Sequence, residues 1–267
     1  RRASRSGQGA PLRPRVSGLP TLAIPELWCV DLRAAAPALH AIEQRVPRLC
    51  PGDRARGSAF SDAAARHEWL ATHIALRLLI ERAAGPEWRG VSFTRSERGK
   101  PHLEAAPLAF SLSHTRGLAL IGMARQGSIG VDIERSRTVH VGEERRARIE
   151  AAGAALAAPP LPAAEDARFL QAWVRLEAYA KADGGGIGRL LTRLGIFGTG
   201  KAVASQEAGT GDRAAVAAAF VGGEAPSVRD LQLGQDIYAA AVFAGAPPTS
   251  DVAWLPASAK GLEKLIS

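Results

Sequence analysis

Residues 108–135 read LAFSLSHTRGLALIGMARQGSIGVDIER, and this stretch decides the class of fold. Three short apolar runs lie within it, at 108–115, 118–124 and 129–135, and glycines occur in the connections between them. Short apolar runs punctuated by glycine are typical of β-strands joined by turns. The stretch therefore predicts consecutive β-strands in the middle of the chain.

Helical patterns flank these strands on both sides. Upstream, residues 61–82 carry a broad apolar face, Asp62 can cap the first turn, and Gly85 follows the last. Downstream, residues 167–183 (ARFLQAWVRLEAYAKAD) predict a long helix that three consecutive glycines end. Helices on either side of a strand cluster favour the α+β class.

The two halves of the chain resemble each other. Each contains a helical pattern and closes on small and apolar residues, GLALIGMA at 117–124 and DIYAAAVFA at 236–244. Two α+β units of roughly 110 residues each fall in the usual size range for domains. A site is expected in the cleft between them. The predicted divisions are a disordered basic tail at 1–20, an N-terminal half at 21–126, a C-terminal half at 127–248 and a C-terminal tail at 249–267.

Composition is that of an ordinary globular protein, since 46% of the 267 residues are hydrophobic and 22% are charged. No apolar run approaches the length of a membrane helix, and no apolar core follows the basic start, as a secretory signal would require. The two cysteines, Cys29 and Cys50, have neither metal-ligand nor redox spacing. These features predict a cytoplasmic protein without a disulfide framework.

The net charge of +8 predicts attraction to an acidic partner. Nucleic acid, an anionic membrane and a polyphosphate substrate all fit this charge. Five of the basic residues lie in the first fifteen positions, which weakens any inference about a folded basic surface. Charge alone leaves the partner open.

The segment Gly130-Val131-Asp132-Ile133-Glu134 is the first candidate site. Alternate residues of a strand point to one face, so Asp132 and Glu134 present two carboxylates side by side. Crowded carboxylates repel each other, and Mg²⁺ relieves this by taking one or two of them together with phosphate oxygens. The other interpretation is an edge strand with one solvated face.

Trp173, Glu177 and Lys181 recur at i, i+4 and i+8 of the predicted helix and form one stripe. A functional interpretation places the lysine on a phosphate and the glutamate near a nucleophile. Gly184 and Gly186 follow and would let a backbone approach a ligand closely. A surface ion pair beside a half-buried tryptophan explains the stripe equally well.

Two shorter motifs contain basic and hydroxyl side chains. Lys100 precedes Pro101, which biases the lysine toward an extended conformation. Ser113 and His114 close a predicted strand, where both could hydrogen-bond phosphate oxygens. A turn and a satisfied polar pair are the alternatives. Because no serine lies in a G-x-S-x-G elbow, a Ser-His-Asp hydrolase is disfavoured.

The four motifs, taken in order, resemble those of the Sfp-type 4′-phosphopantetheinyl transferases. The order is GKP, S-L-S-H, G-V-D-I-E and W-x-x-x-E-A-x-x-K-x-x-G-x-G, and it covers roughly residues 50–190. The resemblance implies a pseudo-dimer of two α+β halves with coenzyme A and Mg²⁺ in the cleft between them. It also implies transfer of 4′-phosphopantetheine from coenzyme A to a serine of an apo acyl or peptidyl carrier protein, with release of 3′,5′-ADP.

The resemblance further implies roles for individual residues. Asp132 and Glu134 resemble the magnesium ligands. Glu177 resembles the base that activates the acceptor serine, and Lys181 its catalytic partner on the pyrophosphate. The implied coenzyme A contacts are Arg56, Lys100, Pro101, Ser113, His114 and Lys181.

Three positions depart from the family pattern. Glu68 stands where a first-helix arginine is expected, which leaves Arg66 as the substitute phosphate contact. Glu150 is the acid nearest to the expected third metal ligand, and a water molecule is the alternative. Leu176 stands where a lysine commonly precedes the catalytic glutamate, with Arg175 one place earlier.

Two other functions are considered. A D-x-E metal-dependent phosphohydrolase or nuclease would use water in place of a carrier protein. A basic nucleic-acid-binding module would need aromatic residues interleaved with a basic face, and aromatics make up only 5% of this chain. The resemblance instead implies a monomer whose partners are coenzyme A and carrier proteins of fatty-acid, polyketide or nonribosomal peptide biosynthesis, without nucleic-acid or membrane partners.

Overall fold

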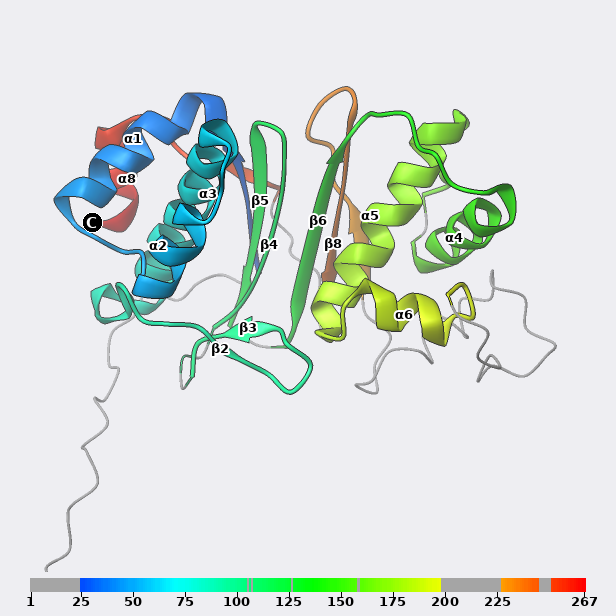
Figure 1. The fold of residues 1–267 in the computed structure, drawn as a ribbon, viewed down its shortest axis with the longest axis horizontal. Coiled ribbons are helices and arrows are strands. Elements are labelled where there is room, and N and C mark those ends of the chain that lie inside the picture. Colours follow the sequence, from blue (N-terminus) through cyan, green and yellow to red (C-terminus); the bar gives the residue numbers. More distant parts are fainter. Residues whose placement is uncertain are drawn as a thin grey trace, which may run out of the picture.

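Two β-sheets lie at the centre of the protein, and helices cover their outer sides (Figure 1). This computed structural model describes residues 25–104, 106, 108–125, 127–157, 159–197, 227–244 and 251–267. The predicted tail at 1–20 and the predicted boundary at position 126 lie outside the described residues. The α+β class is confirmed, because the helices and the mainly antiparallel strands occur in separate groups along the chain.

The first half begins with one strand and three α-helices, and its remaining strands follow them. A short 3₁₀ turn at Pro86–Trp88 follows the longest of them. The elements are β1 (Glu26–Asp31), α1 (Leu32–Arg45), α2 (Pro51–Ser58), α3 (Ala63–Ala84), β2 (Thr94–Arg95), β3 (Pro101–His102), β4 (Ala109–Thr115) and β5 (Leu118–Ala124).

The second half repeats the order of a strand, helices and a strand pair. Its elements are β6 (Ile129–Arg135), α4 (Glu143–Leu156), α5 (Glu165–Asp183), α6 (Ile187–Arg193), β7 (Ser227–Asp230) and β8 (Ile237–Phe243). The chain continues through β9 (Ala253–Trp254) and α8 (Ala259–Ile266).

The sheets divide along the same line. One has the order β4-β5-β1-β9, with β9 parallel to β1 and the other neighbours antiparallel. The other has the antiparallel order β6-β8-β7, and β2 and β3 form a separate small hairpin. Figure 1 shows β4 and β6 near each other where the two sheets meet.

Three apolar clusters hold these layers together. One packs α1, α3 and α8 on the first sheet, and another packs α4, α5 and α6 on the second. The third joins the inner faces of both sheets, through fully buried side chains such as Leu120, Val131 and Ala241. Burial of this surface is the main stabilising contribution to the arrangement.

Local signals in the sequence account for the helix ends. The carboxylate of Asp62 accepts a hydrogen bond from the Ala65 backbone N–H at 2.6 Å, which caps α3. Gly184 ends α5 in the left-handed conformation, with φ of 79°, where a side chain would be strained. The predicted helix ends at these two positions are confirmed.

The predicted C-terminal tail is wrong for the part that the structure describes. Ala253 and Trp254 add a short strand to β1, and α8 packs on α1 and α3. Leu262 of α8 is fully buried in the N-terminal core. The end of the chain is therefore a structural part of the first half.

None of the helices among the described residues is long and apolar enough to cross a lipid bilayer.

Gly130 lets α5 approach β6 closely. A Cβ at this position would lie 1.9 Å from the carbonyl oxygen of Ala178 and 2.5 Å from the backbone nitrogen of Ala182. Both atoms belong to the helix backbone, so the clash could be relieved only by moving α5. Because Gly130 faces α5, Asp132 and Glu134 two and four residues later face it as well.

We expect Gly130→Ala to destabilise the fold by about 1–3 kcal/mol or more, the usual cost of forcing extra volume into a packed core. The measurement is the free energy of unfolding in denaturant. Gly188→Ala is the matched control, because a Cβ at Gly188 in α6 meets nothing within 4 Å. Equal stability of the Gly130→Ala variant and the unmodified protein would contradict the close approach.

Candidate active site

Asp132 and Glu134 lie on the side of β6 that α5 covers. Asp132 has only 6% of its surface exposed, and its Oδ1 accepts hydrogen bonds from Ser113 Oγ and Lys181 Nζ, both at 2.6 Å. Glu134 is less buried and lies 3.5 Å from the Arg137 guanidinium. The interpretation of this strand face as a solvated edge is therefore wrong.

Glu177 and Lys181 lie one turn apart on the face of α5 that meets β6. Burial raises the pKa of the Glu177 carboxyl, the nearby charges of Asp132 and Glu134 add to this rise, and the Lys181 ammonium opposes it. Three carboxylates and one ammonium thus share a partly enclosed space. The stripe is part of a polar cluster rather than a surface ion pair.

The residues of this cluster fit a magnesium ion held by few protein ligands. Among the described residues, no group of three or more His, Cys, Asp and Glu side chains is arranged as a metal cage. Mg²⁺ commonly takes only one or two carboxylates and completes its shell with water and substrate phosphates. Besides burial, the negative charges of Asp132 and Glu134 raise the pKa of Glu177. A divalent cation bound among these three carboxylates would relieve their mutual repulsion.

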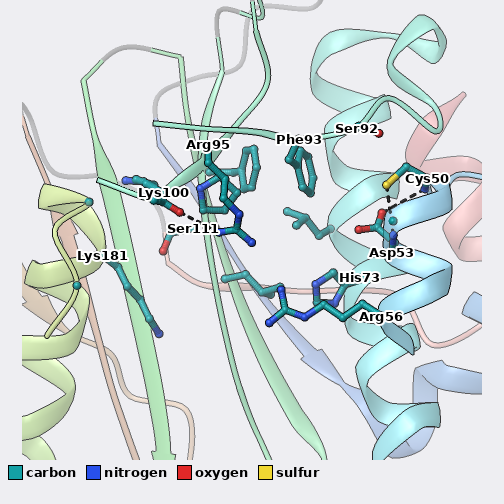
Figure 2. Close-up of a pocket in the computed structure, with 18 of the residues that line it drawn as sticks. Cys50, Asp53, Arg56, His73, Ser92, Phe93, Arg95, Lys100, Ser111 and Lys181 are labelled. Atoms are coloured by element: carbon teal, nitrogen blue, oxygen red, sulfur yellow. Dashed lines mark hydrogen bonds between the residues drawn. The ribbon is translucent and has the colours of Figure 1, made fainter. Parts of the chain in front are cut away.

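A cavity of about 690 Å³ adjoins the cluster and extends from α2 and α3 past β4 to the end of α5. In Figure 2, Lys181 reaches toward this space from α5, while Arg56 and His73 approach it from the helices on the other side. The carboxylate of Asp53, also in the lining, is paired with Arg77 at 2.6 Å. The basic lining residues are Arg56, Arg95, Arg98, Lys100 and Lys181. The excess of cations suits a ligand with several negative charges.

Lys100 lies where the two halves meet. Its Nζ donates hydrogen bonds to the carbonyl oxygens of Ile129 at 2.9 Å and Ala182 at 3.3 Å. Burial lowers the pKa of Lys100 to about 8, and the carboxylate of Asp183 opposes this shift. The ammonium therefore connects β3 to the second half and loses its charge closer to neutral pH than an ordinary lysine.

Aromatic rings line another part of the cavity. Trp69 and His73 of α3 stack with ring centroids 3.7 Å apart, and Phe93 and Phe110 lie 4.7 Å apart. Burial lowers the pKa of His73 to about 4, so its imidazole is neutral at pH 7. The cavity thus combines cations with an uncharged wall, which fits a ligand that carries both phosphates and apolar or aromatic groups.

The structure brings together four of the predicted coenzyme A contacts. Arg56, Lys100, Pro101 and Lys181 all line the cavity, although they come from α2, the β3 segment and α5. Their separation along the chain exceeds 120 residues, so only the tertiary fold gathers them.

The other three predicted contacts are placed differently. Ser113 is buried, and its hydroxyl donates to Asp132. His114 is exposed on β4 and is not part of the described cavity lining. Arg66 is exposed on the first turn of α3, outside the cavity lining.

Two charged residues considered for the site have partners elsewhere. Glu150 of α4 accepts a hydrogen bond from Arg168 at 2.7 Å, and the structure does not bring it to Asp132 and Glu134 as a metal-binding group. Arg175 is fully buried and pairs with Asp230 at 2.6 Å, so it does not take the place of the lysine expected at Leu176.

Arg95 and His73 line the cavity although the sequence predicted no role for them, and Arg98, at the start of the Arg98-Gly99-Lys100-Pro101 motif, lines it too. A signal for Arg95 was present, because Gly99 can take the left-handed conformation of a tight turn and has φ of 90° in the structure. The resulting hairpin pairs Arg95 with Pro101, next to Lys100. For His73, no local pattern distinguished it from an ordinary helix residue.

The fold and the site together define an α+β protein with a cationic cavity for a phosphate-rich ligand beside a carboxylate cluster. No family model matches the sequence. The chain is 31% identical over 147 residues to the 4′-phosphopantetheinyl transferase HetI of Nostoc sp., which covers 53% of this chain and 62% of HetI. It is 29% identical over 114 residues to slr0495 of Synechocystis sp., provisionally named a 4′-phosphopantetheinyl transferase, which covers 41% of this chain and 44% of that protein.

Both of these proteins are named 4′-phosphopantetheinyl transferases, and the chain is similar to them over part of its length. The matched regions span about half the length of these curated relatives.

Proposed function

We propose that this protein transfers the 4′-phosphopantetheine group of coenzyme A to a serine of an apo acyl or peptidyl carrier protein. The observation that carries the proposal is the continuity of the site: Lys181 lines the cationic cavity and also hydrogen-bonds Asp132 of the carboxylate cluster. A polyphosphate bound in the cavity would therefore reach the carboxylates. The similarity to two named transferases supports the same reaction.

The proposed reaction is a substitution at phosphorus. The acceptor serine Oγ forms a bond to the phosphorus that carries the pantetheine arm, and the phosphoanhydride bond to that phosphorus breaks. The proton of the serine passes to Glu177, and 3′,5′-ADP leaves with the electron pair of the broken bond. Positioning and electrostatic stabilisation contribute most of the rate in such reactions.

Each residue of the site has one proposed task. Arg56, Arg95 and Lys100 hold the phosphates of coenzyme A, and Lys181 neutralises the pyrophosphate. Asp132 and Glu134 would hold Mg²⁺, which supplies charge stabilisation as the phosphoanhydride breaks. Because Glu150 is bound to Arg168, we leave it out of the metal site.

The two halves are proposed to form a pseudo-dimer that shares this one site. The repeated order of a strand, helices and a strand pair supports the duplication. Since both walls of the site come from a single chain, we propose a monomer that meets its carrier protein at the open side of the cavity.

The test is to mix the protein with coenzyme A, Mg²⁺ and a panel of apo carrier proteins, and to measure the intact mass of each carrier. Addition of one phosphopantetheine group supports the proposal. Release of products from coenzyme A without a change in carrier mass would indicate a phosphohydrolase. A salt-sensitive shift on DNA without any response to coenzyme A would indicate a nucleic-acid-binding module.

A pH dependence of coenzyme A binding follows from Lys100. With a pKa of about 8, this ammonium is mostly charged at pH 7 and mostly neutral at pH 9. An anionic ligand favours the charged form, so we expect the Kd for coenzyme A to rise by up to about tenfold between these values, as one unit of pKa allows. In Lys100→Arg the guanidinium stays charged, and the dependence should weaken. Calorimetric titration at both pH values decides, and a flat profile for the unmodified protein would exclude this role.

A further inference from the structure

The hairpin of β2 and β3 carries Arg95, Arg98 and Lys100 to the cavity. Its strands are two residues long, and its turn is held by hydrogen bonds between Ser96 and Lys100. An isolated two-stranded hairpin is at best marginally stable in water. Contacts with another part of the protein are therefore needed to hold its three cations in place.

Those contacts lie at the C-terminal end of α5, in the other half of the chain. The guanidinium of Arg98 donates to Asp183 Oδ1 at 2.9 Å, and Lys100 Nζ donates to the neighbouring Ala182 carbonyl oxygen. Gly184 permits close packing here, because a Cβ at its position would lie 3.3 Å from Lys100 Cβ. Two cations of the hairpin thus meet the negative end of the helix dipole.

Asp183 connects three segments at this point. Its Oδ2 accepts a hydrogen bond from Arg193 of α6 at 3.1 Å, while its Oδ1 binds Arg98. The Asp183 side chain is only 1% exposed, against 36% for Arg98 and 31% for Arg193. A buried carboxylate with two charged partners has a fixed position. The exposed side chains of Arg98 and Arg193 would not be held in place without it.

The hairpin also borders a second cavity of about 650 Å³. Arg98, Lys100 and Pro101 of the hairpin line both cavities. Asp183 borders the second cavity and is absent from the described lining of the first. The side chain of Asp183 therefore does not line the first cavity, whereas its partner Arg98 does.

We propose that Asp183 is a positioning residue for the coenzyme A site: it fastens the hairpin to α5 and α6 and so holds Arg98 and Lys100 at the cavity. This inference rests on the proposed function, because coenzyme A is the ligand expected in the cavity. Asp183 touches neither the ligand nor the reacting atoms.

The sign of the effect separates this role from simple electrostatics. Asp183→Asn removes a negative charge near a cationic cavity, which by Coulomb attraction alone would strengthen the binding of an anion. If Asp183 positions the hairpin, the same change weakens binding. A hydrogen bond to a charged group is worth about ten- to a hundredfold in affinity, so we expect Kd to rise between about ten- and a hundredfold.

The experiment is calorimetric titration of coenzyme A, without carrier protein, into the unmodified protein, Asp183→Asn, Arg98→Gln and the double variant. Because Asp183 acts on the cavity through Arg98, the double variant should bind coenzyme A little worse than the weaker-binding of the two single variants. Hydrogen exchange of residues 94–102 should become faster in Asp183→Asn. In the transfer assay, KM for coenzyme A should rise while kcat at saturation changes less.

Two matched controls complete the design. Asp230→Asn breaks the buried pair with Arg175 inside the second half, so it should lower the melting temperature and leave coenzyme A affinity unchanged. Glu97→Gln removes an exposed negative charge from the same hairpin and should not weaken binding. Should Asp183→Asn fail to fold, Arg193→Gln tests the same tie from outside both cavities, with a smaller rise in Kd expected.

The outcomes distinguish this inference from the proposed function. Absence of coenzyme A binding by the unmodified protein overturns the proposed function, and the inference with it. If the unmodified protein binds and Asp183→Asn binds equally well or more tightly, only the positioning role is overturned. Equal weakening by Asp183→Asn and Asp230→Asn overturns it too, since the effect would then be general destabilisation.

Discussion

Replacing Glu177 with glutamine should lower kcat by on the order of 10²–10⁴-fold, the usual contribution of a general base. Glutamine keeps the shape and hydrogen bonding of the side chain but cannot accept the serine proton. Coenzyme A affinity should change little, because the cations of the cavity hold the phosphates. Single-turnover transfer, with coenzyme A binding measured separately, checks both parts.

Glu165→Gln is the matched control for this prediction, because Glu165 lies on the same helix but is exposed in its first turn. We expect it to transfer at the normal rate. Transfer at the normal rate by Glu177→Gln would show that this glutamate is not the base. Its raised pKa would then reflect only its burial beside the other carboxylates.

Replacing Asp132 with asparagine should lower the rate by a comparable or larger factor and remove most of the response to Mg²⁺. The change removes a proposed metal ligand and leaves Lys181 without its charged partner at 2.6 Å. Charge stabilisation by a metal is worth several kcal/mol, and about 1.4 kcal/mol corresponds to tenfold, so a loss on the order of 10²–10⁴-fold is expected.

The measurement is the transfer rate against Mg²⁺ concentration, together with Mn²⁺ binding by electron paramagnetic resonance. Ser113→Ala is the control, since it removes one hydrogen bond to the same oxygen but no charge. We expect it to cost about 1.5–3 kcal/mol in stability, as for a hydrogen bond to a charged group, and to retain the metal response. An unchanged magnesium dependence in Asp132→Asn would remove this residue from the metal site.

Local patterns in the sequence predicted the central strands and the two longest helices. The strands at 109–115, 118–124 and 129–135 and the helix that ends at Asp183 follow from apolar runs, caps and glycines that act within a few residues. The period of a strand likewise places Asp132 and Glu134 on one face, and the period of a helix places Glu177 and Lys181 on one face. These features need no partner elsewhere in the chain.

What the sequence by itself determined was therefore the α+β class, the main elements and the residues that carry the proposed chemistry. Only the tertiary structure decided which of them meet. Lys181 contacts Asp132 because Gly130 lets α5 lie close to β6. Arg98 binds Asp183, which is 85 positions further along the chain. Glu150 binds Arg168 and so does not join the carboxylate cluster. The same holds for β9, whose two residues carry little signal and pair with β1 from the far end of the chain. The physical reason is that such contacts depend on packing between distant segments, which no local period or propensity encodes.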